Sequence, residues 1–229
     1  MFVTVQTIIQ NAERLLQDAR LLAERGSYRT AIALAILSLE ESGKACLVTW
    51  IKEGHLLSTE REAARHIDKQ RIFVTSRIFK AIKSVYKAYK VDRGAAKGDH
   101  QARSWEEHLP KLAEAIETHV TVLRKTIEEG LLDHWKQAGF YVDIDDALNV
   151  VAPAIEFSEP WFDMFATDAD EALQMAKSEP DDHEIMAILY KTYKADSVTL
   201  TPKERSNAIG AFAEHLEPYL RREGDNADA

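Results

Sequence analysis

The chain has 229 residues, of which 45% are hydrophobic and 29% are charged, a composition typical of a folded globular protein. Its nine glycines and six prolines are few, which disfavours a turn-rich all-β fold, and its single cysteine excludes an intrachain disulfide and a multi-cysteine zinc site. No apolar run approaches the roughly 20 residues that a membrane span needs, so we expect no membrane partner and a cytoplasmic location.

The net charge of −9 is unevenly distributed along the chain. Residues 1–103 carry a net charge of +7, whereas residues 104–229 carry a net charge of −16. A protein divided in this way can present one basic face to an anionic partner in spite of its acidic total. RNA is therefore a candidate partner.

Helical periodicity dominates the first part of the sequence. Apolar residues recur at helical spacing over residues 5–23, and Gly26 follows as a stop signal. Ser27 is placed to cap a second helix that ends near residue 52. We expect a third helix from residue 58 or 59 to about 90, a loop over 91–103, and a helix over 104–138 with Gly130 as its weak point.

The sequence changes character near residue 145. The segment 140–145 is expected to be extended, and prolines and acidic residues become frequent after it. Shorter helices are expected at about 159–177, 182–194 and 202–222. We therefore predict a helical bundle over residues 1–145 and an acidic helical extension over residues 146–229.

The second helix places charge where its pattern predicts core. Glu41 lies within an apolar stripe, Glu40 lies between other apolar positions, and Lys44 follows both at ion-pair spacing. Such carboxylates must be solvated, paired or protonated. One interpretation is a structural ion-pair network that fixes helix register, and the other is a functional polar cavity. The pattern leaves both interpretations open.

The third helix has an apolar face and an opposite basic face. The basic face consists of Arg77, Lys80, Lys83, Lys87 and Lys90. Aromatic residues interleave with it, and such a face can bind RNA because cations hold phosphates and aromatic rings stack on bases. The alternative is a solvated lysine face that only keeps the helix soluble.

His66 lies near the start of the third helix, after Arg61 and before Lys69. An imidazole can take and give protons near neutral pH, and a neighbouring cation can stabilise phosphate charge during RNA cleavage. A histidine on a helix can equally be structural or merely exposed. Nucleotide-binding loops, the hydrolase elbow and metal-ligand spacings are absent from the sequence, so we expect no cofactor and no metal. The spacing leaves one alternative open, a metal held by Glu40, Glu41 and His66 if these side chains meet in space.

Three segments, in this order, resemble the signature of AbiV-type abortive-infection proteins. They are the alanine-rich run into Ser38-x-Glu40-Glu41-x-Gly43-Lys44, the His66-x-x-Lys69 pair, and the segment Gly139-Phe140-Tyr141-Val142-Asp143. Together they cover roughly residues 5–145. The resemblance implies an all-α fold, a HEPN-like antiparallel helical bundle that is usually dimeric and serves bacterial antiphage defence. The additional C-terminal helical lobe expected here after residue 145 lies outside the resemblance.

The resemblance also implies candidate site residues. Many HEPN proteins are metal-independent ribonucleases with an arginine and a histidine a few residues apart, and this motif points to Arg61 and His66. The AbiV-like pattern points to five residues as candidate catalytic residues: Glu40, Glu41, Lys44, His66 and Lys69. In typical HEPN ribonucleases the Arg-His motif lies on a late helix, whereas here it lies at the start of the third.

Two classes of function follow from these observations. In the first, an RNA-cleaving or RNA-binding effector shuts down translation in infected cells. His66 would be the general acid and base, Arg61 and Lys69 would stabilise phosphate charge, and Glu41 with Lys44 would orient them. In the second, a non-enzymatic interaction module senses a phage-encoded protein or blocks translation by binding. The resemblance implies a homodimer.

Overall fold

The computed structural model describes residues 4–56, 65–95, 110, 114, 125–141, 143–144, 150–151 and 157–196. The helices are α1 (Val5–Ala23), α2 (Tyr28–Lys52), α4 (His66–Ala95), α6 (Leu131–Phe140), α7 (Glu159–Ala176) and α8 (Pro180–Asp196). Two short strands, β1 (Asp143–Ile144) and β2 (Val150–Val151), pair antiparallel. The predicted all-α class is confirmed. None of the helices in these ranges combines the length and apolarity that crossing a membrane would need.

The chain divides into two compact units. The first consists of Met1–Phe73 and Arg124–Glu179, so it contains α1, α2, the start of α4, α6 and α7. The second consists of Val74–Leu123 and Pro180–Ala229, and it contains the rest of α4 together with α8. Helix α7, which follows residue 145, thus belongs to the same unit as α1 and α2.

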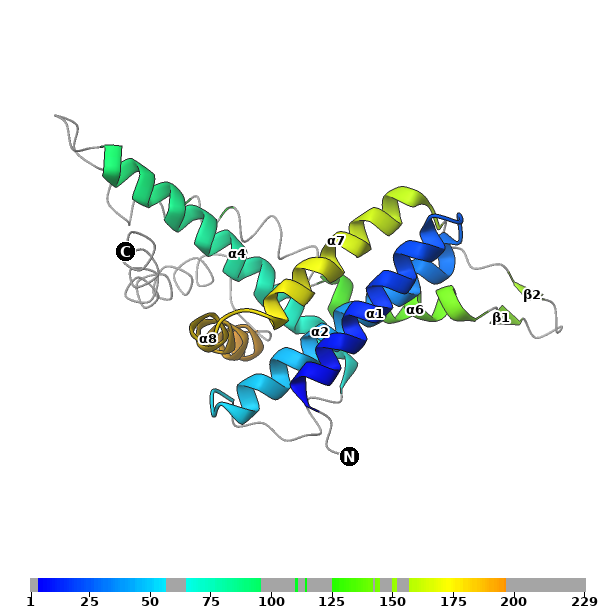
Figure 1. The fold of residues 1–229 in the computed structure, drawn as a ribbon, viewed down its shortest axis with the longest axis horizontal. Helices are drawn as coiled ribbons and strands as arrows, with labels where there is room; N and C mark the ends of the chain where they lie inside the picture. Colours follow the sequence, from blue (N-terminus) through cyan, green and yellow to red (C-terminus); the bar gives the residue numbers. More distant parts are fainter. Residues whose placement is uncertain are drawn as a thin grey trace. The chain divides into compact units, whose positions relative to one another are not determined.

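The first unit is built around α2 (Figure 1). Helices α1, α6 and α7 each pack against α2, and α1 also packs against α7. Apolar residues occur all round α2, as a central helix requires, and the buried ones include Ala31, Ile32, Ile36, Leu39 and Trp50. Each large apolar side chain buried in this way stabilises the fold by about 1.5–3 kcal/mol.

The helix ends of the first unit follow local sequence signals. The Thr4 hydroxyl caps α1 by accepting a hydrogen bond from the backbone N–H of Thr7 at 3.2 Å. Gly26 adopts a φ of +72° after α1, a left-handed conformation that favours glycine. Ser27 precedes α2 as predicted, but its side chain makes no capping hydrogen bond. Gly130, with a φ of +71°, interrupts the predicted helix over 104–138, so that α6 begins at Leu131.

Helix α4 is longer at its carboxyl end than predicted. We expected it to end near residue 90, before a loop over 91–103, but the helix continues to Ala95. Charged residues and one glycine do not stop a helix that is already formed, because each added residue contributes another hydrogen bond. The prediction of one helix from residue 58 or 59 is wrong at its amino end, because Arg65 is not helical and α4 begins at His66. Residues 57–64, most of the segment 104–124 and the helix predicted at 202–222 lie outside the described residues.

Two glycines let α4 and α6 approach α2 closely. A Cβ atom at Gly43 of α2 would lie 2.2 Å from the backbone oxygen of Lys69, at the start of α4. A Cβ atom at Gly139 of α6 would lie 2.5 Å from the Cβ atom of Ala33 in α2. Both distances are shorter than carbon and oxygen atoms tolerate, so both positions require glycine. These contacts bring polar residues of α4 and α6 toward the middle of α2.

Arg29 of α2 fixes the carboxyl end of α6. Its Nε donates a hydrogen bond to the carbonyl of Ala138 at 2.7 Å, and its Nη2 donates to the carbonyl of Tyr141. These bonds satisfy carbonyl groups that a helix end leaves without partners. Ala138, Gly139 and Tyr141, of which the last two belong to the resemblance, therefore dock the end of α6 on α2.

Candidate functional site

Three helices of the first unit bring four polar side chains together around the buried carboxylate of Glu40. Glu40 comes from the middle of α2, His66 and Gln70 come from the start of α4, and Asp133 and Lys136 come from α6. Residues three or four apart share one face of a helix, which is why α4 and α6 each present two side chains. We call these five residues the Glu40 cluster.

Glu40 is the centre of this cluster, and its side chain is only 3% exposed. Its Oε1 accepts hydrogen bonds from Gln70 Nε2 at 2.8 Å and from Lys136 Nζ at 2.7 Å. Its Oε2 lies 2.8 Å from His66 Nδ1. Burying an unpaired carboxylate costs on the order of several kcal/mol, and these three partners offset that cost.

The contact with Glu40 determines how the His66 ring can be used. An ionised carboxylate only accepts hydrogen bonds, so Nδ1 of His66 must carry the proton. Lys136 Nζ lies 3.4 Å from the same nitrogen, but this contact is longer and joins two donors. In the neutral ring, Nε2 is then the proton acceptor. The side chain is 55% exposed, and Nε2 has no hydrogen-bond partner in the part of the chain that the structure describes.

Lys136 joins the carboxylates of Glu40 and Asp133. Its Nζ donates to Asp133 Oδ1 at 2.7 Å, and its side chain is 11% exposed. Burial lowers the pKa of Lys136, but its hydrogen bonds to Asp133 and Glu40 and the charges of these carboxylates outweigh burial and raise the pKa above its ordinary value. Lys136 is therefore charged at neutral pH and balances the carboxylates.

Glu41 belongs to a different network from its neighbour Glu40. Its Oε2 accepts a hydrogen bond from Asn11 Nδ2 of α1 at 3.3 Å and lies 3.4 Å from Lys44 Nζ. Arg14 donates in turn to the Asn11 side chain at 3.0 Å. Adjacent helical residues point about 100° apart, so one carboxylate faces α1 while the other faces α4 and α6. The structure thus places Glu41 and Lys44 with Asn11, and Glu40 with His66.

The structure describes only one of the two cations predicted to lie near His66. Arg61 lies outside the described residues. Lys69 is 8% exposed, and its backbone oxygen packs against Gly43. Arg65, the residue before His66, pairs with the fully buried Asp68, which also lies 3.5 Å from Arg71 Nη1. The start of α4 therefore carries a second ion-pair network beside the Glu40 cluster.

The predicted basic face of α4 lies in the second unit. Lys80 and Lys87 are exposed, Arg77 is partly exposed, and the side chain of Lys90 lies outside the description. Lys83 Nζ lies 2.9 and 3.2 Å from the two carboxylate oxygens of Asp182 in α8. An acidic residue from the C-terminal part of the chain therefore already pairs with one lysine of this face.

Sequence reasoning missed Gln70, Asp133 and Lys136. Gln70 had a usable signal, because it follows His66 by four residues and so shares its face of α4. Asp133 and Lys136 had none, because the packing of α6 beside α2 is a long-range contact that no local sequence pattern reveals.

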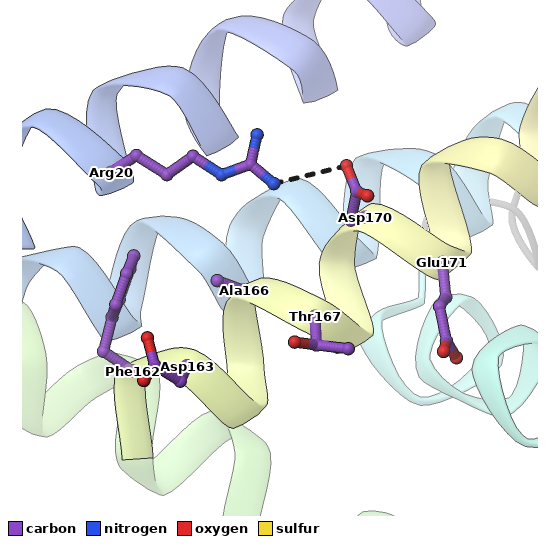
Figure 2. Close-up of a pocket in the computed structure, with 7 residues that line it drawn as sticks. All are labelled: Arg20, Phe162, Asp163, Ala166, Thr167, Asp170 and Glu171. Carbon is purple, nitrogen blue, oxygen red and sulfur yellow. Dashed lines mark hydrogen bonds and ion pairs between the residues drawn. The ribbon is translucent and has the colours of Figure 1, made fainter. Parts of the chain in front are cut away.

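Two other features do not extend the site. Cys46 is fully buried, and burial raises the pKa of its thiol to about 12, so it cannot act as a thiolate nucleophile. A pocket of about 460 Å³ lies between α1 and α7, and within it Arg20 pairs with Asp170 at 3.4 Å (Figure 2). None of the residues that line this pocket belongs to the Glu40 cluster. The lining consists of Arg20, Phe162, Asp163, Ala166, Thr167, Asp170 and Glu171.

Comparison with models of protein families gives a match over most of the chain. The family model of AbiV, a HEPN family, matches residues 3–178, a stretch that contains every member of the Glu40 cluster and extends past residue 145. No curated protein and no solved structure matches the chain.

Lys136→Met should destabilise the protein far more than Lys125→Met. The first change leaves two carboxylates without their buried cation, which costs about 3–5 kcal/mol. The second removes an exposed pair with Glu129, whose nitrogen and oxygen lie 3.8 Å apart, and costs below about 1 kcal/mol. Denaturant unfolding of both variants measures the difference. Equal losses in the two variants would show that Lys136 does not neutralise a buried charge.

Proposed function

Because the chain belongs to the AbiV family of HEPN-like abortive-infection proteins, we propose that it acts in antiphage defence as an RNA-cleaving effector. One observation carries this proposal: the buried carboxylate of Glu40 lies 2.8 Å from Nδ1 of His66, whose ring is 55% exposed. In a general base of this kind, a carboxylate accepts a hydrogen bond from one imidazole nitrogen and leaves the other nitrogen accessible to substrate.

The chemistry follows from the free nitrogen of His66. Nε2 would take the proton from a ribose 2′-hydroxyl, and the 2′-oxygen would attack the adjacent phosphorus. The bond from phosphorus to the 5′-oxygen would break, and the imidazolium would return a proton to that oxygen. The products would be a 2′,3′-cyclic phosphate and a 5′-hydroxyl. No step needs a metal ion, because proton transfer by the ring activates both oxygens.

Other residues would bind the RNA substrate and support the site. Charge on the reacting phosphate would be stabilised by Arg61 and Lys69, and Glu41 with Lys44 would support the bundle from the α1 side. The basic face of α4, with Lys80 and Lys87 exposed, would hold the RNA backbone. We further propose a cytoplasmic homodimer and a phage-encoded protein as its trigger.

A binding module without catalytic activity is the second candidate. Trp161 and Met164, three residues apart on α7, are each 42% exposed, and Tyr141 is 68% exposed. Large exposed apolar side chains of this kind favour contact with another protein. In this case the Glu40 cluster would serve only to hold α2, α4 and α6 together.

His66→Ala should abolish RNA cleavage, whereas His134→Ala should not. His134 is an exposed histidine on α6 and is the matched control. Loss of a general acid and base lowers a rate by about 10²–10⁴-fold. Purified protein would be incubated with total bacterial RNA and tRNA, with and without EDTA, and new 5′-hydroxyl ends would be labelled with polynucleotide kinase. The expected cleavage survives EDTA.

Two outcomes of this experiment would count against an RNA-cleaving enzyme. Equal cleavage by wild type and His66→Ala would remove His66 from the chemistry. No cleavage by a folded wild-type dimer or monomer would favour the binding module.

Glu40→Gln and Glu41→Gln provide a second matched pair. Glutamine at position 40 can donate as well as accept hydrogen bonds, so it no longer fixes the proton on Nδ1 of His66. We expect cleavage to fall by about 10²-fold or more, as for other carboxylates that orient a catalytic histidine. Glu41→Gln changes the network with Asn11 and Lys44, so we expect less than about a 3-fold change in rate and a stability loss of about 1 kcal/mol. A larger loss of rate in Glu41→Gln would place Glu41 in the site.

A further inference from the structure

Glu40, His66 and Asp133 provide the donor atoms of a metal site, although no metal-ligand spacing in the sequence indicates one. One carboxylate oxygen of each acid and one imidazole nitrogen all lie within 4.8 Å of one another. The three residues come from α2, α4 and α6, three separate helices that the glycine contacts described above hold together. The donor set is therefore built by the fold and not by one flexible segment.

The place that a metal ion would take is occupied by the ammonium group of Lys136. Its Nζ lies 2.7 Å from Glu40 Oε1, 2.7 Å from Asp133 Oδ1 and 3.4 Å from His66 Nδ1. An ammonium ion and a divalent ion compete for the same carboxylate oxygens, since both are cations that need oxygen partners. The structure thus holds a cation at this point, and the chain itself supplies that cation.

We propose that Glu40, His66 and Asp133 form a latent divalent-metal site, which the ammonium group of Lys136 keeps free of metal. Removal of that ammonium opens the site to a cation such as Zn²⁺ or Co²⁺, because one imidazole nitrogen with two carboxylates suits these ions better than Mg²⁺ or Ca²⁺. Metal–ligand distances are near 2.1 Å. To reach that distance from the position of Nζ, the Glu40 and Asp133 oxygens would move inward by about 0.6 Å and His66 Nδ1 by about 1.3 Å.

Metal at this site and a free base at His66 exclude each other. Coordination through Nδ1 requires that this nitrogen lose its proton, and the neutral ring then carries its proton on Nε2. A ring in that state cannot take a proton from a substrate. Lys136 thus has a second consequence beyond charge balance: by excluding metal, it leaves Nδ1 to donate to Glu40 and Nε2 to accept a proton. This inference goes beyond RNA cleavage, and metal binding tests it without any activity.

The test is a cobalt titration of the Lys136→Met variant in metal-free buffer. We expect one Co²⁺ per chain, with a visible absorption band of a low-coordinate site and an unfolding temperature that rises by several degrees. Wild type and Lys125→Met should bind Co²⁺ at least ten-fold more weakly. The double variant Lys136→Met with Asp133→Asn should lose the gain in affinity, because it lacks one ligand.

Affinity of Lys136→Met no higher than that of wild type, or undiminished affinity in the double variant, would overturn the proposal. If Lys136→Met does not fold without metal, it and Lys136→Gln would be refolded with and without Zn²⁺. Recovery only with Zn²⁺ would support the latent site, and no recovery in either buffer would overturn it. These results are independent of whether the wild-type protein cleaves RNA.

Discussion

A carboxylate in the middle of a helical core requires partners, and in this protein Glu40 is that carboxylate. Its side chain is 3% exposed in a helix whose other buried residues are mostly apolar. The desolvation cost of such a group is several kcal/mol by the usual order-of-magnitude figure, and it must be met by hydrogen bonds and opposite charge. Gln70, Lys136 and His66 meet it from two other helices. The packing of α4 and α6 against α2 is therefore tied to one buried charge.

The same interaction gives the site its chemical character. The carboxylate fixes the proton of His66 on the inner nitrogen, and the exposed ring presents the outer nitrogen to solvent. Lys136 balances the negative charge without occupying that outer nitrogen, since its contacts are with Glu40 and Asp133. A structural ion-pair network and the proposed functional site are thus compatible here. The network that holds three helices together is also the network that orients the histidine.

Much of the fold could be predicted from the sequence, because its signals are local. The period of apolar residues and Gly26 located α1 and α2 correctly, and Gly130 was recognised as a weak point. The importance of charge in α2 was also predictable, because Glu40 interrupts an apolar pattern. The partners of Glu40 could not be predicted, because Glu40 and Glu41 look alike in the sequence and differ only in their direction around the helix. Lys136 is 96 residues away from Glu40, and no local pattern joins the two.

The central claim is that Glu40 holds the proton of His66 on Nδ1 and leaves Nε2 as the base. Long-range hydrogen–nitrogen NMR spectra of the ¹⁵N-labelled protein test it directly, with the His66 signals identified by their loss in His66→Ala. At a pH where the ring is neutral, we expect a protonated Nδ1 and an unprotonated Nε2. We also expect this preference to weaken in Glu40→Gln. A neutral His66 with its proton on Nε2 would contradict the account, because the exposed nitrogen would then be unable to accept a proton.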